Sequence, residues 1–155
     1  ETGSVDNIGK TMSILNEMDL PAKAIVDLDY VFKGAIHSNF IEKDNKHLEV
    51  LRALLISLSE DGIIEMKGDL PNAKHCEKMA CDPRSIEAIN ELKAKLQEHN
   101  IWLWSKGVIE AHLGIRGKNE HEWARFKTEV ETRVGGLANV CADYDSVHAC
   151  INWLE

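Results

Sequence analysis

The 155-residue sequence predicts an α/β fold in which helices flank a parallel sheet. Three observations lead to this prediction. Apolar residues recur with a helical period in several segments, two short apolar runs at residues 23–28 and 101–104 are typical of buried strands, and each run closely follows a predicted helix. Strands that alternate with helices are characteristic of parallel sheets, so we expect the two runs to share one sheet.

The apolar periods and the turn residues place the helices. The first is expected between an N-cap at Asp6 and Pro21, and the second carries a leucine stripe and ends at residues 61–62. A third begins at Asp82-Pro83, an N-cap followed by a proline in the first helical position, and continues to about His99.

The remaining segments are less regular. Residues 30–45 are expected to form a loop with a short helix, residues 63–66 a short strand, and residues 68–72 a turn. Beyond residue 115, a charged helix is predicted to end at residues 135–136, and it carries Trp123, Phe126 and Val130 on one face. The last helix carries an apolar stripe formed by Val147, Cys150, Ile151 and Leu154.

Composition excludes several classes of protein. The chain is 44% hydrophobic and 28% charged, as in ordinary globular domains. No apolar stretch reaches the ~20 residues of a membrane span, and no signal peptide is apparent, so we expect a soluble cytoplasmic protein. The net charge of −8 argues against a protein whose whole surface grips nucleic acid.

The four cysteines are too few and too irregular for a disulfide scaffold, so reduced thiols are expected. His75, Cys76 and Cys81 resemble half of a zinc site. Because no matching second pair follows, zinc is disfavoured.

The run Ala24-Ile25-Val26-Asp27-Leu28-Asp29 ends in two carboxylates one residue apart. Alternate residues of a strand point to the same side and lie ~6.6 Å apart along the backbone, so both acids are expected on one face. Such a pair favours a hard divalent cation such as Mg²⁺. The alternative is a strand end whose acids are solvated or cap the next helix.

Lys106 and Glu110 follow the second predicted strand. Strand ends in one α/β sheet open at the same edge, so these residues could meet Asp27 and Asp29 around a common cleft. Three acids and a lysine suit phosphoryl chemistry, in which metal ions activate water and the lysine steadies phosphate charge. Alternatively, the dipole of a helix N-terminus favours Glu110 there, and Lys106 and Glu110 pair on the surface.

Three segments together resemble a known family. They are residues 3–10 (GSVDNIGK), residues 24–29 (AIVDLD) and residues 103–113 (LWSKGVIEAHL). In this order and strand context they resemble the Toprim domain of OLD-family (overcoming lysogenization defect) nucleases. The Asp-x-Asp strand end is similar to the Toprim acidic motif, and the Lys-Gly-x-x-Glu segment is similar to the motif after the last core strand.

The resemblance implies a Toprim-like domain at residues 1–115 with a helical insertion at about 31–99, followed by a helical C-terminal extension at 116–155. It implies metal-dependent cleavage of DNA with one or two Mg²⁺ or Mn²⁺ ions. Asp27, Asp29 and Glu110 would be metal ligands, and Lys106, Glu110 and Asp27 catalytic residues. Members of this family carry an ATPase domain in the same chain, through which ATP would act, and many serve in phage defence or DNA repair.

The sequence departs from the family pattern in two ways. It has no strand with a glutamate ahead of the first helix, and it has no phosphate-binding Gly-x-x-x-x-Gly-Lys-Ser/Thr loop. We therefore expect the chain to be a fragment of an ATPase-coupled nuclease and to be inactive alone. The sequence leaves open whether the protein forms a homo-oligomer. Arg116 and Lys118 are candidate DNA contacts, although interleaved glutamates favour a solvated mixed-charge helix for the basic residues beyond Glu110.

Two other functions remain open at this point. In a haloacid-dehalogenase-like phosphatase, Asp27 would be the nucleophile and Asp29 the general acid. Tyr30 after the second Asp and the lack of a later strand that ends in paired Asp residues count against it. The second alternative is a non-catalytic Toprim-like interaction module in which Trp102, Trp104 and Trp123 serve packing.

Overall fold

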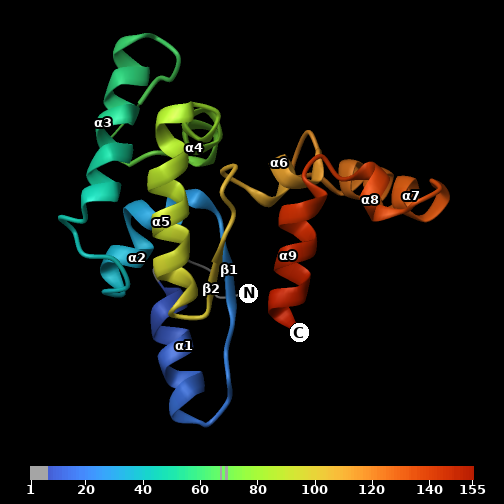
Figure 1. Cartoon of the computed structure of the whole chain (residues 1–155), viewed down its shortest axis with the longest axis horizontal. Helices are drawn as coiled ribbons and strands as arrows, with labels where there is room; N and C mark the ends of the chain where they lie inside the picture. The colour runs from blue at the N-terminus through green and yellow to red at the C-terminus, as the bar shows by residue number, and fades with distance from the viewer. Residues whose placement is uncertain (1–6, 67, 69) are drawn as a thin grey trace. The chain divides into compact units, whose positions relative to one another are not determined.

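The computed structural model describes residues 7–66, 68 and 70–155, and Figure 1 follows their elements along the chain. The chain divides into two compact units, residues 1–107 and 108–155, which are described separately below. The domain boundary predicted after residue 115 stays a prediction.

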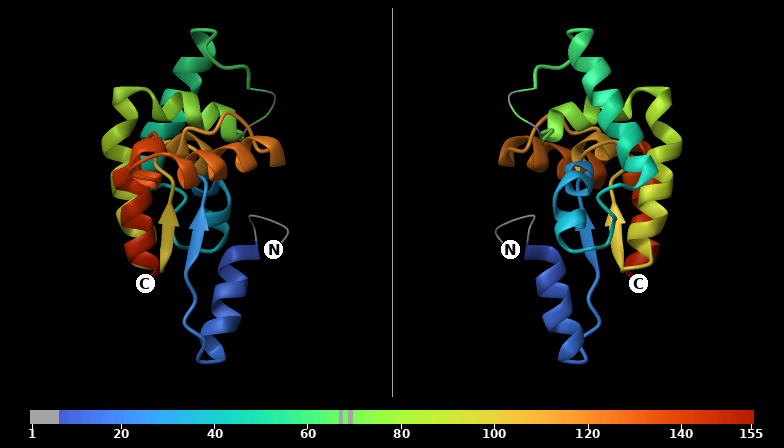
Figure 2. Two further views of the ribbon diagram at one scale, coloured as in Figure 1. Left: turned by 90° about the vertical axis from the view of Figure 1, so that its right-hand side faces the viewer. Right: turned by 90° about the vertical axis from the view of Figure 1, so that its left-hand side faces the viewer.

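The first unit is built around two parallel strands, β1 (Ala24–Val26) and β2 (Ile101–Leu103). Ala24 pairs with Ile101 and Val26 with Leu103, and Figure 2 shows the two arrows side by side and pointing the same way. The predicted α/β class with a parallel sheet flanked by helices is confirmed. The other elements of this unit are α1 (Ile8–Glu17), η2 (Leu28–Phe32), α2 (Gly34–His37), α3 (Lys46–Glu60), α4 (Ala73–Ala80), η3 (Pro83–Ser85) and α5 (Ile86–Gln97).

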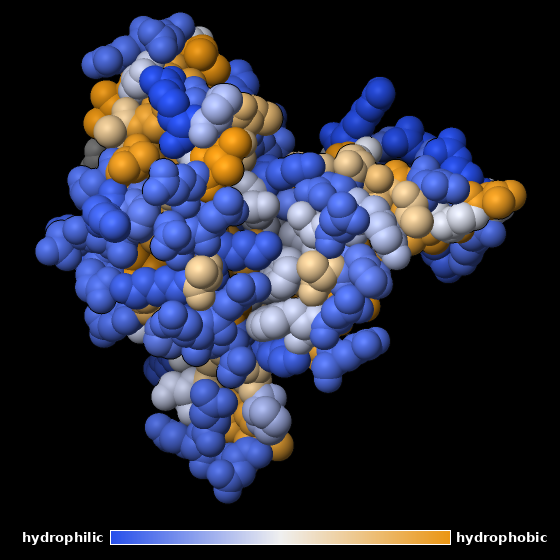
Figure 3. Space-filling model, viewed as in Figure 1, coloured by the Kyte–Doolittle hydropathy of each residue, from blue (hydrophilic) through white to orange (hydrophobic). Residues whose placement is uncertain are grey.

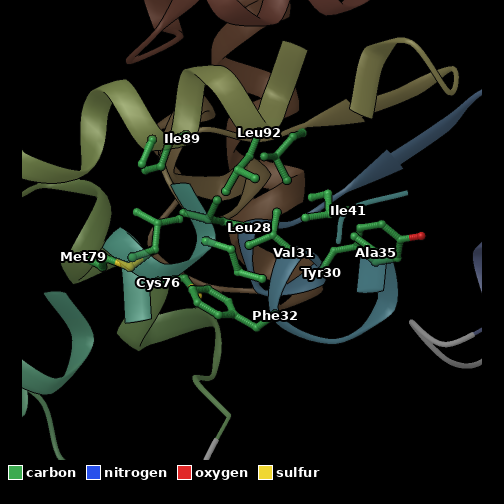
Figure 4. Packing of buried hydrophobic residues seen from close by; sticks show 14 of the residues in the cluster. Leu28, Tyr30, Val31, Phe32, Ala35, Ile41, Cys76, Met79, Ile89 and Leu92 are labelled. Carbon is green, nitrogen blue, oxygen red and sulfur yellow. The ribbon is translucent and has the colours of Figure 1, made fainter. Parts of the chain in front are cut away.

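A single apolar core fills this unit. The predicted leucine stripe lies on the buried face of α3, which packs against α5. Figure 4 shows the part of the core nearest the strand ends, where side chains from η2, α4 and α5 meet: Leu28, Val31, Phe32, Cys76, Met79, Ile89 and Leu92. The core therefore fixes η2 and α4 beside the carboxyl end of β1.

Leu48 is a sensitive position in this core, because its side chain is 0% exposed. Leu48→Ala is expected to lower the free energy of unfolding by about 2–5 kcal/mol, through lost burial and the cavity left behind. Val50 lies on the same helix and is 46% exposed, so Val50→Ala should stay within about 0.5 kcal/mol of the unmutated chain. Urea unfolding of both variants measures the difference, and equal losses would contradict this assignment of the core.

Residues 63–66 were expected to form a strand, and this prediction is wrong. They close helix α3 instead. Gly62 adopts a left-handed conformation with φ of 69° and donates from its N–H to the Ser59 carbonyl at 3.1 Å. Ile63 N–H donates to the Leu58 carbonyl at 2.9 Å, which completes a Schellman motif. The backbone donor of Ile63 that a strand would use therefore belongs to the helix end.

The other predicted elements are largely confirmed. The Asp82 carboxylate caps η3 by accepting a hydrogen bond from Arg84 N–H at 2.9 Å, and α5 follows directly. Residues 30–45 form a short helical segment and loop, as expected. Helix α4 was not among the predicted elements. The proposed cap Asp6 and part of the predicted 68–72 turn lie outside the described residues.

The second unit is helical, and its elements are α6 (Ile109–Leu113), α7 (Glu120–Thr132), α8 (Leu137–Val140) and α9 (Tyr144–Leu154). The charged helix and the terminal helix predicted here are both present. Figure 3 shows one face of the chain, on which hydrophilic residues predominate. None of the helices in the described segments has the length and apolar character needed to span a membrane.

Candidate functional site

Asp27 and Asp29 lie where β1 ends. Asp27 is extended and occupies the N-cap position of η2, and Asp29 lies in its first turn. Helix η2 begins at Leu28, whose side chain is fully buried in the core. The expectation that both acids occupy alternate positions of one strand is therefore wrong, since only the residues up to Val26 belong to β1.

The two acids nevertheless act on a common point, the buried thiol of Cys76 in α4. Burial raises the pKa of this thiol most. The carboxylates of Asp29, Asp27 and Glu77 raise the same pKa further, in that order. All three carboxylates thus contribute negative potential at one place beside the strand end.

Lys106 belongs to the turn after β2, and the backbone fixes this turn beside Asp27. Trp104 N–H donates to the Val26 carbonyl at 3.0 Å, and Leu28 N–H donates to the Gly107 carbonyl at 2.7 Å. These two bonds lie on either side of Asp27 in the segment that follows β1, and on either side of Lys106 in the turn that follows β2. The structure thereby brings the turn that carries Lys106 to the same strand ends as the first two predicted acids, and the Lys106 side chain is exposed.

Gly107 allows this turn to approach α4 closely. Its φ is 100°, and a Cβ at this position would lie 2.9 Å from both the Cα and the backbone nitrogen of Glu77. Only a residue without a side chain fits between the two backbones. The glycine of the predicted Lys-Gly-x-x-Glu segment therefore has a packing role, because it seats the Lys106 turn against the helix that carries Glu77.

Glu77 was not among the predicted site residues, because α4 itself was not predicted. A usable signal was present at the start of this helix. The Asn72 side chain accepts from His75 N–H at 3.1 Å, and the His75 ring nitrogen Nδ1 accepts from Asn72 N–H at 3.3 Å. A capping residue followed three positions later by a side chain that can reach back marks a helix start.

Glu110 belongs to the second unit and lies in the first turn of α6. The residue is only 7% exposed, and within the described part of the chain its Oε2 atom has no hydrogen-bond partner. The ammonium nitrogen Nζ of Lys118 lies 3.7 Å from that oxygen. A buried carboxylate oxygen that accepts no hydrogen bond is poorly satisfied, even with an ammonium group at this distance.

Another titratable pair in the second unit was missed from the sequence. The His112 ring nitrogen Nδ1 lies 2.9 Å from Asp143 Oδ2, and His112 is fully buried. The two residues are 31 positions apart, and no local pattern connects positions so distant. Only the folded chain brings them together.

The basic residues beyond Glu110 mostly lie beside acids. Lys118 pairs with Glu110. Within α7, the Arg125 guanidinium nitrogen Nη2 lies 2.8 Å from Glu122 Oε2. In the same helix, Lys127 Nζ lies 3.7 Å from Glu131 Oε1. This arrangement favours a solvated mixed-charge surface on α7, whereas the assignment of Arg116 and Lys118 to DNA contact stays a prediction.

The grouping of metal-binding side chains and the position of a cavity both bear on where a ligand could bind. Among the residues described, no three His, Cys, Asp or Glu side chains are grouped closely enough to hold a metal ion, and this includes the His75, Cys76 and Cys81 set considered for zinc. A cavity of about 1000 Å³ is lined by residues 62–65, 68 and 70 together with the start of α4, and Asp27, Asp29, Lys106 and Glu110 do not line it. The proposed metal ligands therefore stay a prediction.

The chain is thus a helix-rich α/β protein in which Asp27 and the turn that carries Lys106 lie at the ends of two parallel strands. A comparison with known proteins finds similarity to a nuclease. The chain is 23% identical over 159 residues to the Old nuclease of Escherichia phage P2. The alignment covers 94% of this chain and 26% of that relative, so the chain spans about a quarter of the relative's length. No family model and no solved structure matches the chain.

Proposed function

We propose that this chain forms the acid-bearing part of a metal-dependent DNA endonuclease of the OLD type, within a Toprim-like domain. The observation that carries the proposal is the similarity to the Old nuclease, which extends over 94% of the chain. The position of Asp27 and the Lys106 turn at neighbouring parallel strand ends supports it, because α/β proteins bind ligands at that edge.

In this proposal Asp27, Asp29 and Glu110 would hold one or two Mg²⁺ or Mn²⁺ ions. The donor set suits these ions, since hard divalent cations prefer carboxylate oxygens, and Glu110 Oε2 is a buried oxygen without a hydrogen bond from the described residues. When bound, the metal supplies an activated water and neutralises phosphate charge.

Lys106 would place its ammonium group against the scissile phosphate or the leaving oxygen. Its exposure leaves the side chain accessible to a polyanionic substrate. Coupling to an ATPase domain in the native protein and a role in phage defence or DNA repair belong to the same proposal.

Calorimetric titration with Mn²⁺ tests the metal site in this chain. We expect binding at millimolar or lower concentration, and a loss of affinity of about 10²-fold or more in Asp27→Asn/Asp29→Asn, because two carboxylate ligands are neutralised. Asp44→Asn changes an exposed aspartate in a turn of the same unit and should bind as the unmutated chain does. If the unmutated chain fails to bind Mn²⁺ or Mg²⁺ at millimolar concentration, the proposed site is excluded from it.

A further inference from the structure

His112 and Asp143 join the short helix α6 to the start of α9. Two contacts run between them, because His112 Nδ1 lies 2.9 Å from Asp143 Oδ2 and Asp143 N–H donates to the His112 carbonyl at 2.8 Å. An ionised carboxylate can only accept, so Nδ1–H is the donor to it. Asp143 also caps α9 through Ser146 N–H at 3.4 Å. One residue therefore anchors two helices.

Helix α6 needs such an anchor. It has only five residues, and a helix of this length does not hold its conformation without tertiary contacts. Glu110 precedes His112 by two positions, so the two side chains leave the helix axis about 200° apart. When the His112 ring and carbonyl are held on one side, the backbone of α6 is held as well, and with it the direction in which the Glu110 side chain leaves the helix.

Glu110 is a residue for which orientation matters. Its Oε2 atom is buried without a hydrogen bond from the described residues, and the Lys118 ammonium, at 3.7 Å, is beyond hydrogen-bonding distance. A carboxylate oxygen kept in this state is costly unless a cation completes its surroundings. The fold thus keeps a charged oxygen in place although nothing in the described chain satisfies it fully.

We infer that His112 and Asp143 are positioning residues for Glu110, which hold this carboxylate ready for a divalent cation. The inference rests on the proposed function and adds two residues that act through Glu110, without contact with substrate.

Four variants of this chain test the inference by their Mn²⁺ affinity, measured by calorimetry. Asp143→Ser keeps a capping side chain for α9 but removes the carboxylate that meets His112, and we expect about 10-fold weaker binding. His112→Leu should weaken binding similarly. His112→Asn places an amide N–H near the position of Nδ1 and should restore the affinity to within about 3-fold of the unmutated chain. Asp145→Ser, in the first turn of α9, is the matched control and should bind normally.

Far-UV circular dichroism at room temperature establishes that each variant is folded, so the comparison reports metal affinity alone. Glu110→Gln serves as the reference for losing the positioned carboxylate. Normal Mn²⁺ binding by Asp143→Ser alongside weakened binding by Glu110→Gln would overturn the positioning role and leave the proposed function intact. Normal binding by both Glu110→Gln and Asp27→Asn would instead remove the proposed metal site, and the positioning role with it.

Discussion

Lys106→Ala is expected to reduce DNA cleavage by the native protein by about 10²–10³-fold, the usual cost of removing a group that stabilises charge in the transition state. The side chain is exposed, so the substitution should leave folding intact. Single-turnover cleavage with saturating protein separates this effect from weaker DNA binding. Mn²⁺ affinity should not decrease, because the variant keeps every proposed carboxylate ligand.

Lys10→Ala provides a matched control, since it removes an exposed lysine from α1 in the same unit. It should cleave DNA at the unmutated rate. If Lys106 only contacts a DNA phosphate and has no catalytic role, Lys106→Ala should bind DNA more weakly and with a smaller salt dependence of the affinity. Its single-turnover cleavage rate should then be unchanged. Wild-type cleavage by Lys106→Ala would remove this lysine from the mechanism.

Gly107→Ala is expected to lower the free energy of unfolding by about 2–5 kcal/mol. About 1–2 kcal/mol arises because an L-residue adopts a left-handed backbone conformation unfavourably. The remainder arises because the new Cβ would lie 2.9 Å from backbone atoms of Glu77, which cannot move independently of α4. The Gly107 carbonyl also accepts from Leu28 N–H, so a shift at this position displaces the Lys106 turn from Asp27.

Gly62→Ala isolates the second contribution. Gly62 also has a positive φ, of 69°, but a Cβ there meets no atom within 4 Å. Its substitution should cost only the conformational part, about 1–2 kcal/mol. Urea unfolding of both variants gives the difference, and Mn²⁺ affinity should fall only for Gly107→Ala. If the two substitutions lower the free energy of unfolding equally, the close approach of residue 107 to Glu77 does not contribute to the loss of stability.

The sequence predicts the framework of this fold because its signals are local. The strands at residues 24–26 and 101–103 are short apolar runs, and the leucine stripe of α3 follows the helical period. Residues 63–66 were misassigned because an apolar run looks the same whether it pairs in a sheet or closes a helix. Gly62 adopts the left-handed conformation that a Schellman motif requires, and Ile63 N–H therefore bonds to the end of α3 and not to a neighbouring strand.

The candidate site is only partly predictable for a related reason. Asp27 and Lys106 stand out because each follows an apolar run, and parallel pairing brings those positions together. Glu77 reaches the same strand end through the packing of α4 on the core and on Gly107, and Asp143 reaches His112 only through the folding of the second unit. Contacts of this kind depend on tertiary structure, and a single sequence carries no local signal for them.

Cys76 is protected from oxidation and alkylation by its surroundings in the fold. Peroxides, disulfides and alkylating agents attack the thiolate form of cysteine, and both burial and the neighbouring carboxylates oppose formation of that form here. The sulfur is also closed off from such reagents while the fold persists. The Cys76 sulfur is therefore unreactive in the folded chain, although it lies close to Asp27 and Asp29, which are proposed to bind a divalent metal.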